Sequence, residues 1–439
     1  MDARSKKIVL LIGDVFVLIG ALALTILIRY RAADFNTHFQ THLPRFFFIF
    51  LVFMMALYIN QLYDLNLRAH SRRFLRQTLN TILSAGLVSI IYFYLSISSE
   101  IAPKTNLAIF IGFFLAVFYL WRLAASSLSR SLSQEGLALI GENQKSTTIK
   151  QELLKNPGAG YHLLLSVQNE DGFSGLAHEV VAGKIKTIIL CDDFASKTTG
   201  TFLLSLLAHK VSVWNYPDFY ENLTSKIPVE ALGTDWFLEN LKEGRRHYFQ
   251  VAKRALDLSA AGLIFLISLP FWLFIALAIK FSSPGPVFFR QERLGRQGAK
   301  FSIIKFRTMR MEENDQTHTT ADDKRITRVG NFLRKTRLDE LPQTLNIIRG
   351  EMSFVGPRPE RPELAEKLEE SIPFYNTRLI VKPGLSGWDQ VSGEYHSPTR
   401  EDTLKKLQND LFYIKNRSLF LDFVIILKTI ATVFGRGGR

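Results

Sequence analysis

Hydrophobic residues are concentrated in four long stretches within the first third of the chain. They cover residues 8–28, 46–62, 79–95 and 107–123. A helix needs about 20 mostly apolar residues to cross a bilayer. The first and last stretches fit this requirement best, and the third, which carries serine and glycine, fits it least. The pattern predicts a four-helix transmembrane bundle over residues 1–130.

Basic residues flank these stretches unevenly. Lys6 and Lys7 precede the first stretch, Arg72 lies between the second and third, and Arg122 lies at the end of the fourth. Because Lys and Arg accumulate on the cytoplasmic side of spanning helices, we expect both ends of the bundle in the cytoplasm. Asp14, inside the first stretch, is costly in lipid. We interpret it as a polar contact between packed helices.

A different pattern begins at Gly136, where short apolar runs alternate with polar helical segments. The runs cover residues 137–140, 162–167, 185–190 and 211–214. This alternation predicts a parallel sheet covered by helices, and hence a Rossmann-like α/β domain over residues 135–235. The turn from Gly141 to Lys145 lacks the second and third glycines of the dinucleotide fingerprint. We therefore expect no bound dinucleotide in this domain.

A fifth apolar stretch, residues 258–282, follows Lys253 and Arg254 and contains Pro270 near its middle. A straight helix of this length reaches about 35 Å, so length alone allows it to cross a bilayer. Proline removes a backbone hydrogen bond and bends a helix. We predict a re-entrant membrane helix that enters and leaves on the cytoplasmic side, with Ser268 bonding to a carbonyl freed by the bend. A kinked fifth crossing helix is the alternative.

Composition narrows the range of partners. The chain has 439 residues, 47% of them hydrophobic, and a net charge of +14. Such a charge suits nucleic acid, an anionic membrane face or phosphorylated substrates, and the apolar stretches beside the basic clusters favour the membrane over nucleic acid. The single cysteine, Cys191, excludes an intrachain disulfide and argues against a cysteine-based zinc site. We expect the first stretch to be an anchor rather than a removed signal peptide, and residues 419–434 to lie in the membrane interface.

The candidate chemistry centres on the adjacent carboxylates Asp339 and Glu340. Pro342 follows them, and proline is tolerated only in the first turn of a helix. We therefore expect a helix that begins near Asp339, with Asp339 as its N-cap, and ends at Gly350. A helix N-terminus favours anions, which predicts an ionised Asp339 among basic side chains that bind phosphate. Taken alone, such a pair is more often a helix cap beside ordinary surface charges.

Basic and glycine-rich segments on both sides of the pair supply the other candidates. In the extended run 301–309, Lys305 and Arg307 are expected to point to one side. Two glycine-proline turns follow the pair, and the first of them presents Arg358. Together these segments offer the cations and free N–H groups that a diphosphate substrate needs. The candidate phosphate-binding residues are Arg334, Lys305, Arg307, Arg325, Arg358, Gly356, Pro357, Lys382 and Gly384.

The order of these motifs gives a specific resemblance. The motifs are Lys253-Arg254-x-x-Asp257, Lys305-Phe306-Arg307-Thr308-Met309, Leu338-Asp339-Glu340-Leu341-Pro342-Gln343, Gly356-Pro357-Arg358-Pro359 and Lys382-Pro383-Gly384. Over residues 248–439 the chain resembles the bacterial sugar transferase family, the monotopic polyprenyl-phosphate sugar-1-phosphate transferases. The upstream layout resembles that of the large members of this family. One departure is Arg337, at a position that is more often small.

This resemblance implies a reaction and a location. The family's α/β-type catalytic domain transfers a sugar-1-phosphate, here expected to be a hexose-1-phosphate, from a UDP-sugar to undecaprenyl phosphate and releases UMP. It thereby initiates exopolysaccharide, capsule or O-antigen synthesis. The catalytic domain is implied to be cytoplasmic, on a multi-pass protein of the bacterial inner membrane. Glucose and galactose are the expected sugars, and N-acetylated sugars stay open.

The resemblance also implies roles for individual residues. Asp339 is the implied nucleophile, which forms a covalent phosphosugar intermediate. Glu340 is the implied ligand of Mg²⁺, an ion that takes one or two carboxylates plus substrate phosphates. Arg334 matches a phosphate-binding position. The residues expected at the membrane, near lipid headgroups or the lipid phosphate, are Lys253, Arg254, Asp257, Ser268 and Pro270.

Two other classes of function stay open. A membrane-anchored nucleotide-sugar epimerase or dehydratase needs a glycine-rich dinucleotide turn and a Tyr-x-x-x-Lys pair, and the middle segment offers neither. A non-catalytic scaffold that binds anionic lipid explains the charge but not the Asp339–Glu340 pair. The sequence leaves a homo-oligomer open.

Overall fold

The computed structural model describes residues 3–30, 34–65, 67, 69, 71–95, 103–131, 135–192, 197–241, 247–310, 323, 325–392 and 399–436. These residues form two compact units, Met1–Phe219 and Tyr220–Arg439.

Four long helices open the first unit where the apolar stretches predict them. They are α1 (Ala3–Arg29), α2 (Phe35–Ile59), α3 (Arg72–Leu95) and α4 (Pro103–Ser131). Aromatic rings fill the space between them, including Phe53 and Phe114 at a centroid distance of 4.9 Å. The outward faces are also apolar, as the hydrocarbon core of a bilayer requires. Together with a later helix, α10 (His247–Ser282), these are the five described helices that are long and apolar enough to cross a membrane, judged by length and composition.

A buried ion pair joins α1 to α4. Arg122 donates to the Asp14 carboxylate at 2.6 Å and to the carbonyl of Leu62 at 3.0 Å. Beside it, a Cβ on Gly13 would lie 2.0 Å from the Trp121 ring, so only glycine allows the two helices to approach this closely. The interpretation of Asp14 as a contact between packed helices is confirmed.

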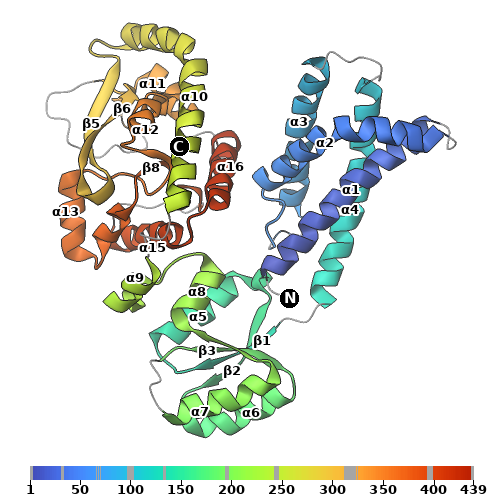
Figure 1. Cartoon of the computed structure of the whole chain (residues 1–439), viewed down its shortest axis with the longest axis vertical. Helices are drawn as coiled ribbons and strands as arrows, with labels where there is room; N and C mark the ends of the chain where they lie inside the picture. The colour runs from blue at the N-terminus through green and yellow to red at the C-terminus, as the bar shows by residue number, and fades with distance from the viewer. Residues whose placement is uncertain are drawn as a thin grey trace. The chain divides into compact units, whose positions relative to one another are not determined.

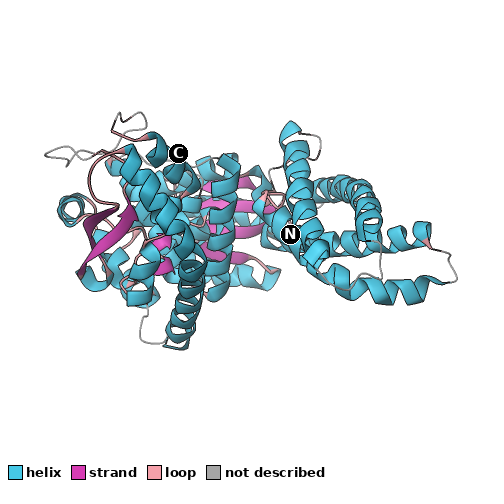
Figure 2. Cartoon of the chain, turned by 90° about the horizontal axis from the view of Figure 1, so that it is seen from above, coloured by secondary structure: helices cyan, strands magenta, loops and turns pink. Residues whose placement is uncertain are grey.

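A parallel sheet follows, with strand order β2-β1-β3-β4. Figure 1 shows α5 and α8 on one face of this sheet and α6 and α7 on the other, and Figure 2 shows the strands covered by helices. The four predicted strands are confirmed in position and direction. The strands are β1 (Glu135–Ile140), β2 (Tyr161–Val167), β3 (Ile185–Leu190) and β4 (Ser212–Asn215), and the helices are α5 (Gln144–Lys155), α6 (Phe173–Val181), α7 (Lys197–Leu206) and α8 (Tyr216–Thr224).

The turn between β1 and α5 is closed by the protein's own side chains. Asn143 caps α5 by accepting from the backbone N–H of Lys145 and Ser146. The amide of Asn143 donates to the carboxylate of Asp192 and to the carbonyl of Cys191. A carboxylate thus lies at the N-terminus of α5, where a dinucleotide phosphate would need positive potential. This arrangement disfavours a dinucleotide.

The second unit begins earlier in the chain than the predicted catalytic domain. Ile227 and Phe237 lie in its hydrophobic core together with Leu407 and Leu411. The backbone N–H of Ile227 donates to the carbonyl of Gln408 in α15 (Arg400–Asn416). Residues 220–235, assigned from the sequence to the middle domain, therefore pack with the second unit. The helix α9 (Thr234–Asn240) begins at the end of this segment.

The long helix α10 (His247–Ser282) has 36 residues and contains Pro270. In Figure 1 its two halves run in different directions. The Ser268 hydroxyl donates to the carbonyl of Phe265 at 3.2 Å and accepts from the Trp272 indole at 3.0 Å. The carbonyl that loses its partner to Pro270 belongs to residue 266, four positions earlier. The prediction that Ser268 bonds to the freed carbonyl is therefore wrong, because its hydroxyl bonds to the carbonyl one residue earlier.

Both halves of α10 contact the rest of the second unit. In the first half, Ala261 packs with Phe301 and Ile347. In the second half, Trp272 packs edge-on against Phe306 at 5.4 Å, and Ile279 joins the same cluster. Between residues 262 and 278, the exposed side chains of α10 are apolar, with Leu266 67% and Phe274 68% exposed. The helix α10 thus exposes an apolar surface, although both of its halves pack on the same second unit.

Short strands and helices complete the second unit. β5 and β6 pair antiparallel, and β7 and β8 pair parallel. The interface prediction for residues 419–434 coincides with α16, whose Phe420 is 76% exposed. The elements are β5 (Phe288–Leu294), β6 (Lys300–Phe306), α11 (Arg328–Thr336), α12 (Gln343–Arg349), β7 (Ser353–Val355), α13 (Pro362–Ser371), β8 (Gly384–Ser386), α14 (Trp388–Val391), α15 (Arg400–Asn416) and α16 (Leu419–Arg436).

Candidate active site

The carboxylate pair lies in a tight turn between two helices. After α11, Arg337 takes a left-handed conformation with φ 59°, and Leu338–Glu340 form a single 3₁₀ turn. α12 then begins at Gln343, with Pro342 at its N-cap position. The prediction that Asp339 caps a helix is wrong, because the left-handed Arg337 turns the chain and places the carboxylates before the helix starts. The predicted end at Gly350 is confirmed by its left-handed φ of 86°.

Glu340 is surrounded by cations from three parts of the chain. Its Oε1 lies 3.1 Å from Lys305 Nζ on β6 and 3.7 Å from a guanidinium nitrogen of both Arg337 and Arg358. Burial by itself would raise the pKa of Glu340, but the charges of Lys305, Arg358 and Arg337 lower it to about 2. Glu340 is therefore a permanent anion. It holds three positive charges beside its neighbour Asp339.

Asp339 is in a different electrostatic state. Its side chain is 9% exposed, and its Oδ1 is buried without a hydrogen-bond partner among the described residues. Burial and then the charge of Glu340 raise its pKa to about 6, although Lys305, Arg337 and Arg334 oppose the rise. The anion expected from the sequence is therefore the main form at neutral pH, but burial makes it less stable than an ordinary aspartate anion. An unpaired, desolvated carboxylate oxygen is a stronger nucleophile than a paired one.

Arg334 approaches the same carboxylate from α11. Its Nε donates to Thr308 Oγ1 at 2.9 Å, and its charge acts on Asp339. A Cβ on Gly330 would lie 1.9 Å from the Thr308 carbonyl, so glycine is required where α11 meets the end of β6. Arg325 is held by Asp323, with Nε 2.8 Å from the carboxylate, and both act electrostatically on Arg334.

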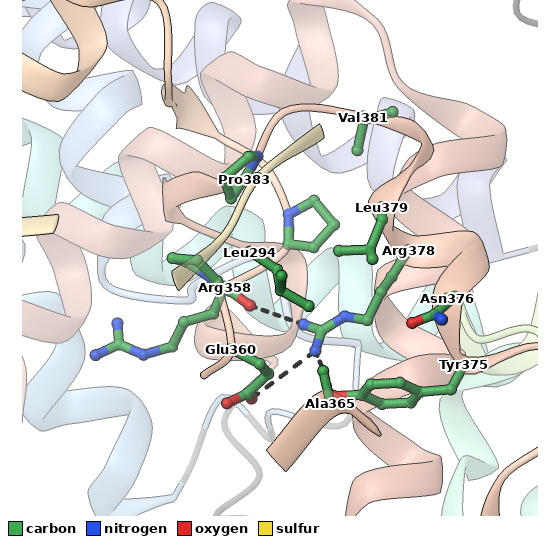
Figure 3. A pocket seen from close by; sticks show the side chains of 13 residues that line it. Leu294, Arg358, Glu360, Ala365, Tyr375, Asn376, Arg378, Leu379, Val381 and Pro383 are labelled. Atoms are coloured by element: carbon green, nitrogen blue, oxygen red, sulfur yellow. Dashed lines mark hydrogen bonds and ion pairs between the residues drawn. The ribbon is translucent and has the colours of Figure 1, made fainter. Parts of the chain in front are cut away.

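The turn that carries Arg358 is fixed from behind by a second buried arginine. Arg378 donates to the Arg358 carbonyl at 2.9 Å and pairs with Asp410 at 2.7 Å, and Figure 3 shows its contacts with Arg358, Glu360 and Tyr375. Arg378 and Asp410 are 3% and 1% exposed. The guanidinium therefore holds the backbone of the turn while the side chain of Arg358 reaches Glu340.

The two glycine-proline turns pack against each other. A Cβ on Gly356 would lie 2.4 Å from the Lys382 carbonyl, and one on Gly384 would lie 2.1 Å from the Gly356 nitrogen. The N–H of Gly356 donates to Ser386, and the N–H of Gly384 donates to the Pro357 carbonyl. These two N–H groups were predicted to be free for phosphate. They are instead used between the turns, because close backbone contact is what the glycines permit.

Four more predicted residues make their contacts elsewhere. Arg307 is buried and donates to the carbonyls of Ser283 and Pro284, so it fastens the end of α10 rather than joining Lys305. Lys253 pairs with Asp422 at 2.6 Å, and Arg254 donates to the carbonyls of Ile347 and Ile348 at the end of α12. Asp257 accepts from the Phe354 N–H. The resemblance put the last three at lipid headgroups, whereas here they bind protein groups.

Lys382 also lies away from Glu340. Its Nζ is near Gly350, and the charge of the neighbouring Arg254 acts on it. Burial first, and then Arg254, lower the pKa of Lys382.

The sequence did not single out Arg337 and Arg378 as site residues. Arg337 was visible in the basic run before the pair, whereas nothing local marks Arg378.

The donor set of the site is compatible with a hard divalent cation. The buried Oδ1 of Asp339 lacks a partner, and Glu340 supplies a second carboxylate. The described residues contain no group of three or more His, Cys, Asp or Glu side chains suited to a metal. An ion here would therefore take most of its ligands from substrate phosphates and water, as Mg²⁺ commonly does. Glu340 would have to give up part of its ion pairing to bind it.

Replacing Arg378 by methionine should destabilise the protein by about 3–5 kcal/mol, because buried Asp410 would lose its cation. The measurement is the unfolding midpoint in detergent. Arg400→Met is the matched control, since Arg400 is exposed and its 3.9 Å pair with Glu230 contributes at most about 1 kcal/mol. Equal shifts for both variants would contradict the role given to Arg378.

Asp339→Asn should stabilise the protein above pH 7. The folded-state pKa of about 6 exceeds the ordinary 3.8, so native stability falls as pH rises from 4 to 6. The full cost above that window is about 3 kcal/mol, and asparagine removes it. Unfolding midpoints at pH 4 and pH 8 should show a gain only at pH 8. Glu366→Gln, an exposed carboxylate on α13, is the control, and a pH-independent effect of Asp339→Asn would refute the assignment.

Comparison with known proteins places the second unit in a family. Residues 248–436 match the family model described as bacterial sugar transferase. The chain is 39% identical over 251 residues to the UDP-N-acetylgalactosamine-undecaprenyl-phosphate N-acetylgalactosaminephosphotransferase of Aeromonas hydrophila, covering 56% of this chain and 58% of that protein. It is 40% identical over 235 residues to the UDP-glucose:undecaprenyl-phosphate glucose-1-phosphate transferase of Xanthomonas campestris, covering 52% and 48%.

A relative of the same printed name from Caulobacter vibrioides is 43% identical over 212 residues, which cover 47% of this chain and 79% of the relative. The matches to the Aeromonas and Xanthomonas proteins span about half of their length. The residues that match the family model contain Asp339 and Glu340. The chain belongs to the bacterial sugar transferase family.

Proposed function

We propose that this protein transfers a hexose-1-phosphate from a UDP-sugar to undecaprenyl phosphate, giving undecaprenyl-diphosphate-sugar and UMP. One observation carries the proposal: a buried carboxylate oxygen without a partner, on Asp339, adjoins a carboxylate that holds three cations. A diphosphate needs such cations for binding, and covalent catalysis needs such an oxygen. The relatives' names, which state the same kind of transfer, support it.

In the first step, the free oxygen of Asp339 attacks the β-phosphorus of the UDP-sugar. The bond between that phosphorus and the bridging oxygen breaks, and UMP leaves with the electron pair. Arg334 and Arg358 lie beside Asp339 and Glu340 and balance the charge that grows on the phosphate oxygens. The product is a phosphosugar joined to Asp339.

In the second step, a phosphate oxygen of undecaprenyl phosphate attacks the same phosphorus. The bond to Asp339 breaks, and the carboxylate leaves as an anion. Neither step needs a proton transfer to its leaving group, because the UMP phosphate and the Asp339 carboxylate are both weakly basic anions. Mg²⁺, which we propose is held by Glu340 and the substrate phosphates, would neutralise phosphate charge when bound.

The hexose is proposed from the names of the relatives. Two of them name glucose and one names N-acetylgalactosamine. The proposed product would start an exopolysaccharide, capsule or O-antigen chain at the inner membrane.

We further propose that α10 is re-entrant and that the catalytic unit is cytoplasmic. A helix that crossed the bilayer would carry its second half to the opposite side from its first. Yet Ala261 in the first half and Trp272 in the second both pack on the same compact unit. Arg307 also returns the end of the helix to that unit through Ser283. These contacts favour a helix that bends at Pro270 and leaves on the side where it entered.

Membranes given radiolabelled UDP-glucose, undecaprenyl phosphate and Mg²⁺ should accumulate label in the lipid fraction. Asp339→Asn should lower the initial rate at least a thousandfold, because the amide is not a nucleophile and removes the covalent step. The native rate should fall as pH drops below about 6, where Asp339 becomes protonated. Glu366→Gln is the control. Unchanged label transfer in Asp339→Asn would eliminate the covalent mechanism.

Cysteine labelling tests the path of α10. In a Cys191→Ser background, Tyr248→Cys and Pro286→Cys place thiols at exposed positions before and after the apolar part of the helix. A re-entrant helix predicts that an impermeant maleimide reaches both only from the cytoplasmic side. Ser283 is unsuitable as a labelling site because it is 7% exposed. Labelling of the two positions from opposite sides would establish a crossing helix.

A further inference from the structure

A polar cluster lies at one end of the four-helix bundle, away from the Asp14–Arg122 pair. It joins the end of α1, the start of α2 and the start of α4. His42 is 2% exposed, with one ring nitrogen 2.6 Å from the His38 carbonyl and the other 3.0 Å from the Asn106 amide. Tyr30 stacks on His38 at 3.9 Å and lies 3.5 Å from the same amide. These contacts form a hydrogen-bonded polar cluster inside an otherwise apolar bundle.

Two arginines border this polar cluster, and the described residues supply no counter-charge to either. Arg29 lies over the Tyr30 ring, and Arg45 lies one turn after His42 on α2. The charges of both act on His42. In each, Nη1 is buried and makes no hydrogen bond, and neither guanidinium forms an ion pair within the part of the chain that the structure describes. A buried guanidinium N–H without an acceptor costs about 1–3 kcal/mol or more.

The other end of the bundle shows how this chain pairs a buried arginine. There Arg122 has the carboxylate of Asp14 and the carbonyl of Leu62. At the Arg29–Arg45 end, no group of the described residues plays that role, and the buried Oδ1 of Asn106 is itself without a partner. The His42 nitrogen facing the His38 carbonyl must donate, so the other nitrogen accepts from Asn106, and the ring has no lone pair left for an arginine. Both arginines are half-buried, and their guanidinium groups need an acceptor that the described residues do not supply.

A phosphate group meets this requirement best. Guanidinium groups bind phosphate through parallel N–H donors, and two of them can share its oxygens. The site lies at the ends of helices long enough to span a membrane, which is the depth of lipid headgroups. We propose that Arg29 and Arg45 together bind the phosphate of an anionic phospholipid, such as phosphatidylglycerol, and that the lipid locks the ends of α1 and α2.

The test compares lipid binding by the full chain and by Arg29→Gln/Arg45→Gln. Phosphatidylglycerol added to the detergent-purified native protein should raise its unfolding midpoint, and phosphatidylcholine should not. Native mass spectrometry should detect retained phosphatidylglycerol. The double variant should need at least tenfold more of this lipid for the same effect. Arg72→Gln/Arg76→Gln, which removes two exposed arginines of α3, is the matched control and should behave as the native chain.

Inorganic phosphate forms the second arm. Protection by millimolar phosphate without phosphatidylglycerol would show a site for the free anion and would overturn the lipid assignment. Equal responses of the native chain and the Gln/Gln variant would overturn the site itself. If the Gln/Gln variant does not fold, Arg29→Lys/Arg45→Lys keeps the charge but not the paired donors. It should weaken phosphatidylglycerol binding several-fold, and native-like binding by this variant would contradict the proposal.

Discussion

The burial of two adjacent carboxylates is the constraint on which the catalytic unit depends. Removing two charges from water costs several kcal/mol each unless cations and donors compensate. Here the compensation is unequal. Glu340 receives Lys305, Arg337 and Arg358, while Asp339 keeps a bare oxygen. The inequality separates the two carboxyl groups into a fixed anion with a pKa of about 2 and a poised one with a pKa of about 6.

The cations that make this possible come from distant positions in the chain. Lys305 is on β6, Arg337 is in the turn itself, and Arg358 follows β7. The turn that carries Arg358 is held from behind by the Arg378–Asp410 pair. Such supports are costly to break, because a buried charge is left alone when its partner is removed. The cations around Glu340 are thus paired, whereas the Oδ1 of Asp339 has no partner among the described residues.

The need to pair polar groups also applies to the apolar helices. α10 exposes apolar side chains along its length and still binds the catalytic unit through Arg254 near its start and Trp272 beyond the bend. In the four-helix bundle, the buried Arg122 is paired with Asp14, whereas Arg29 and Arg45 each keep a buried Nη1 without an acceptor among the described residues. Polar groups within apolar segments thus mark either helix contacts or positions where something outside the described chain must complete the structure.

The sequence by itself determined the positions of the four long helices, the four parallel strands and the Asp339–Glu340 centre, because hydrophobic period, chain length and motif order are local properties. It could not determine that Asp339 lies in a 3₁₀ turn, since no local motif marks the non-glycine Arg337 as left-handed. It also could not separate Lys305, which reaches Glu340, from Arg307 two residues later, which binds the end of α10. Only the tertiary structure decided which of many cations surround the carboxylates, because that choice depends on contacts between segments far apart in the chain.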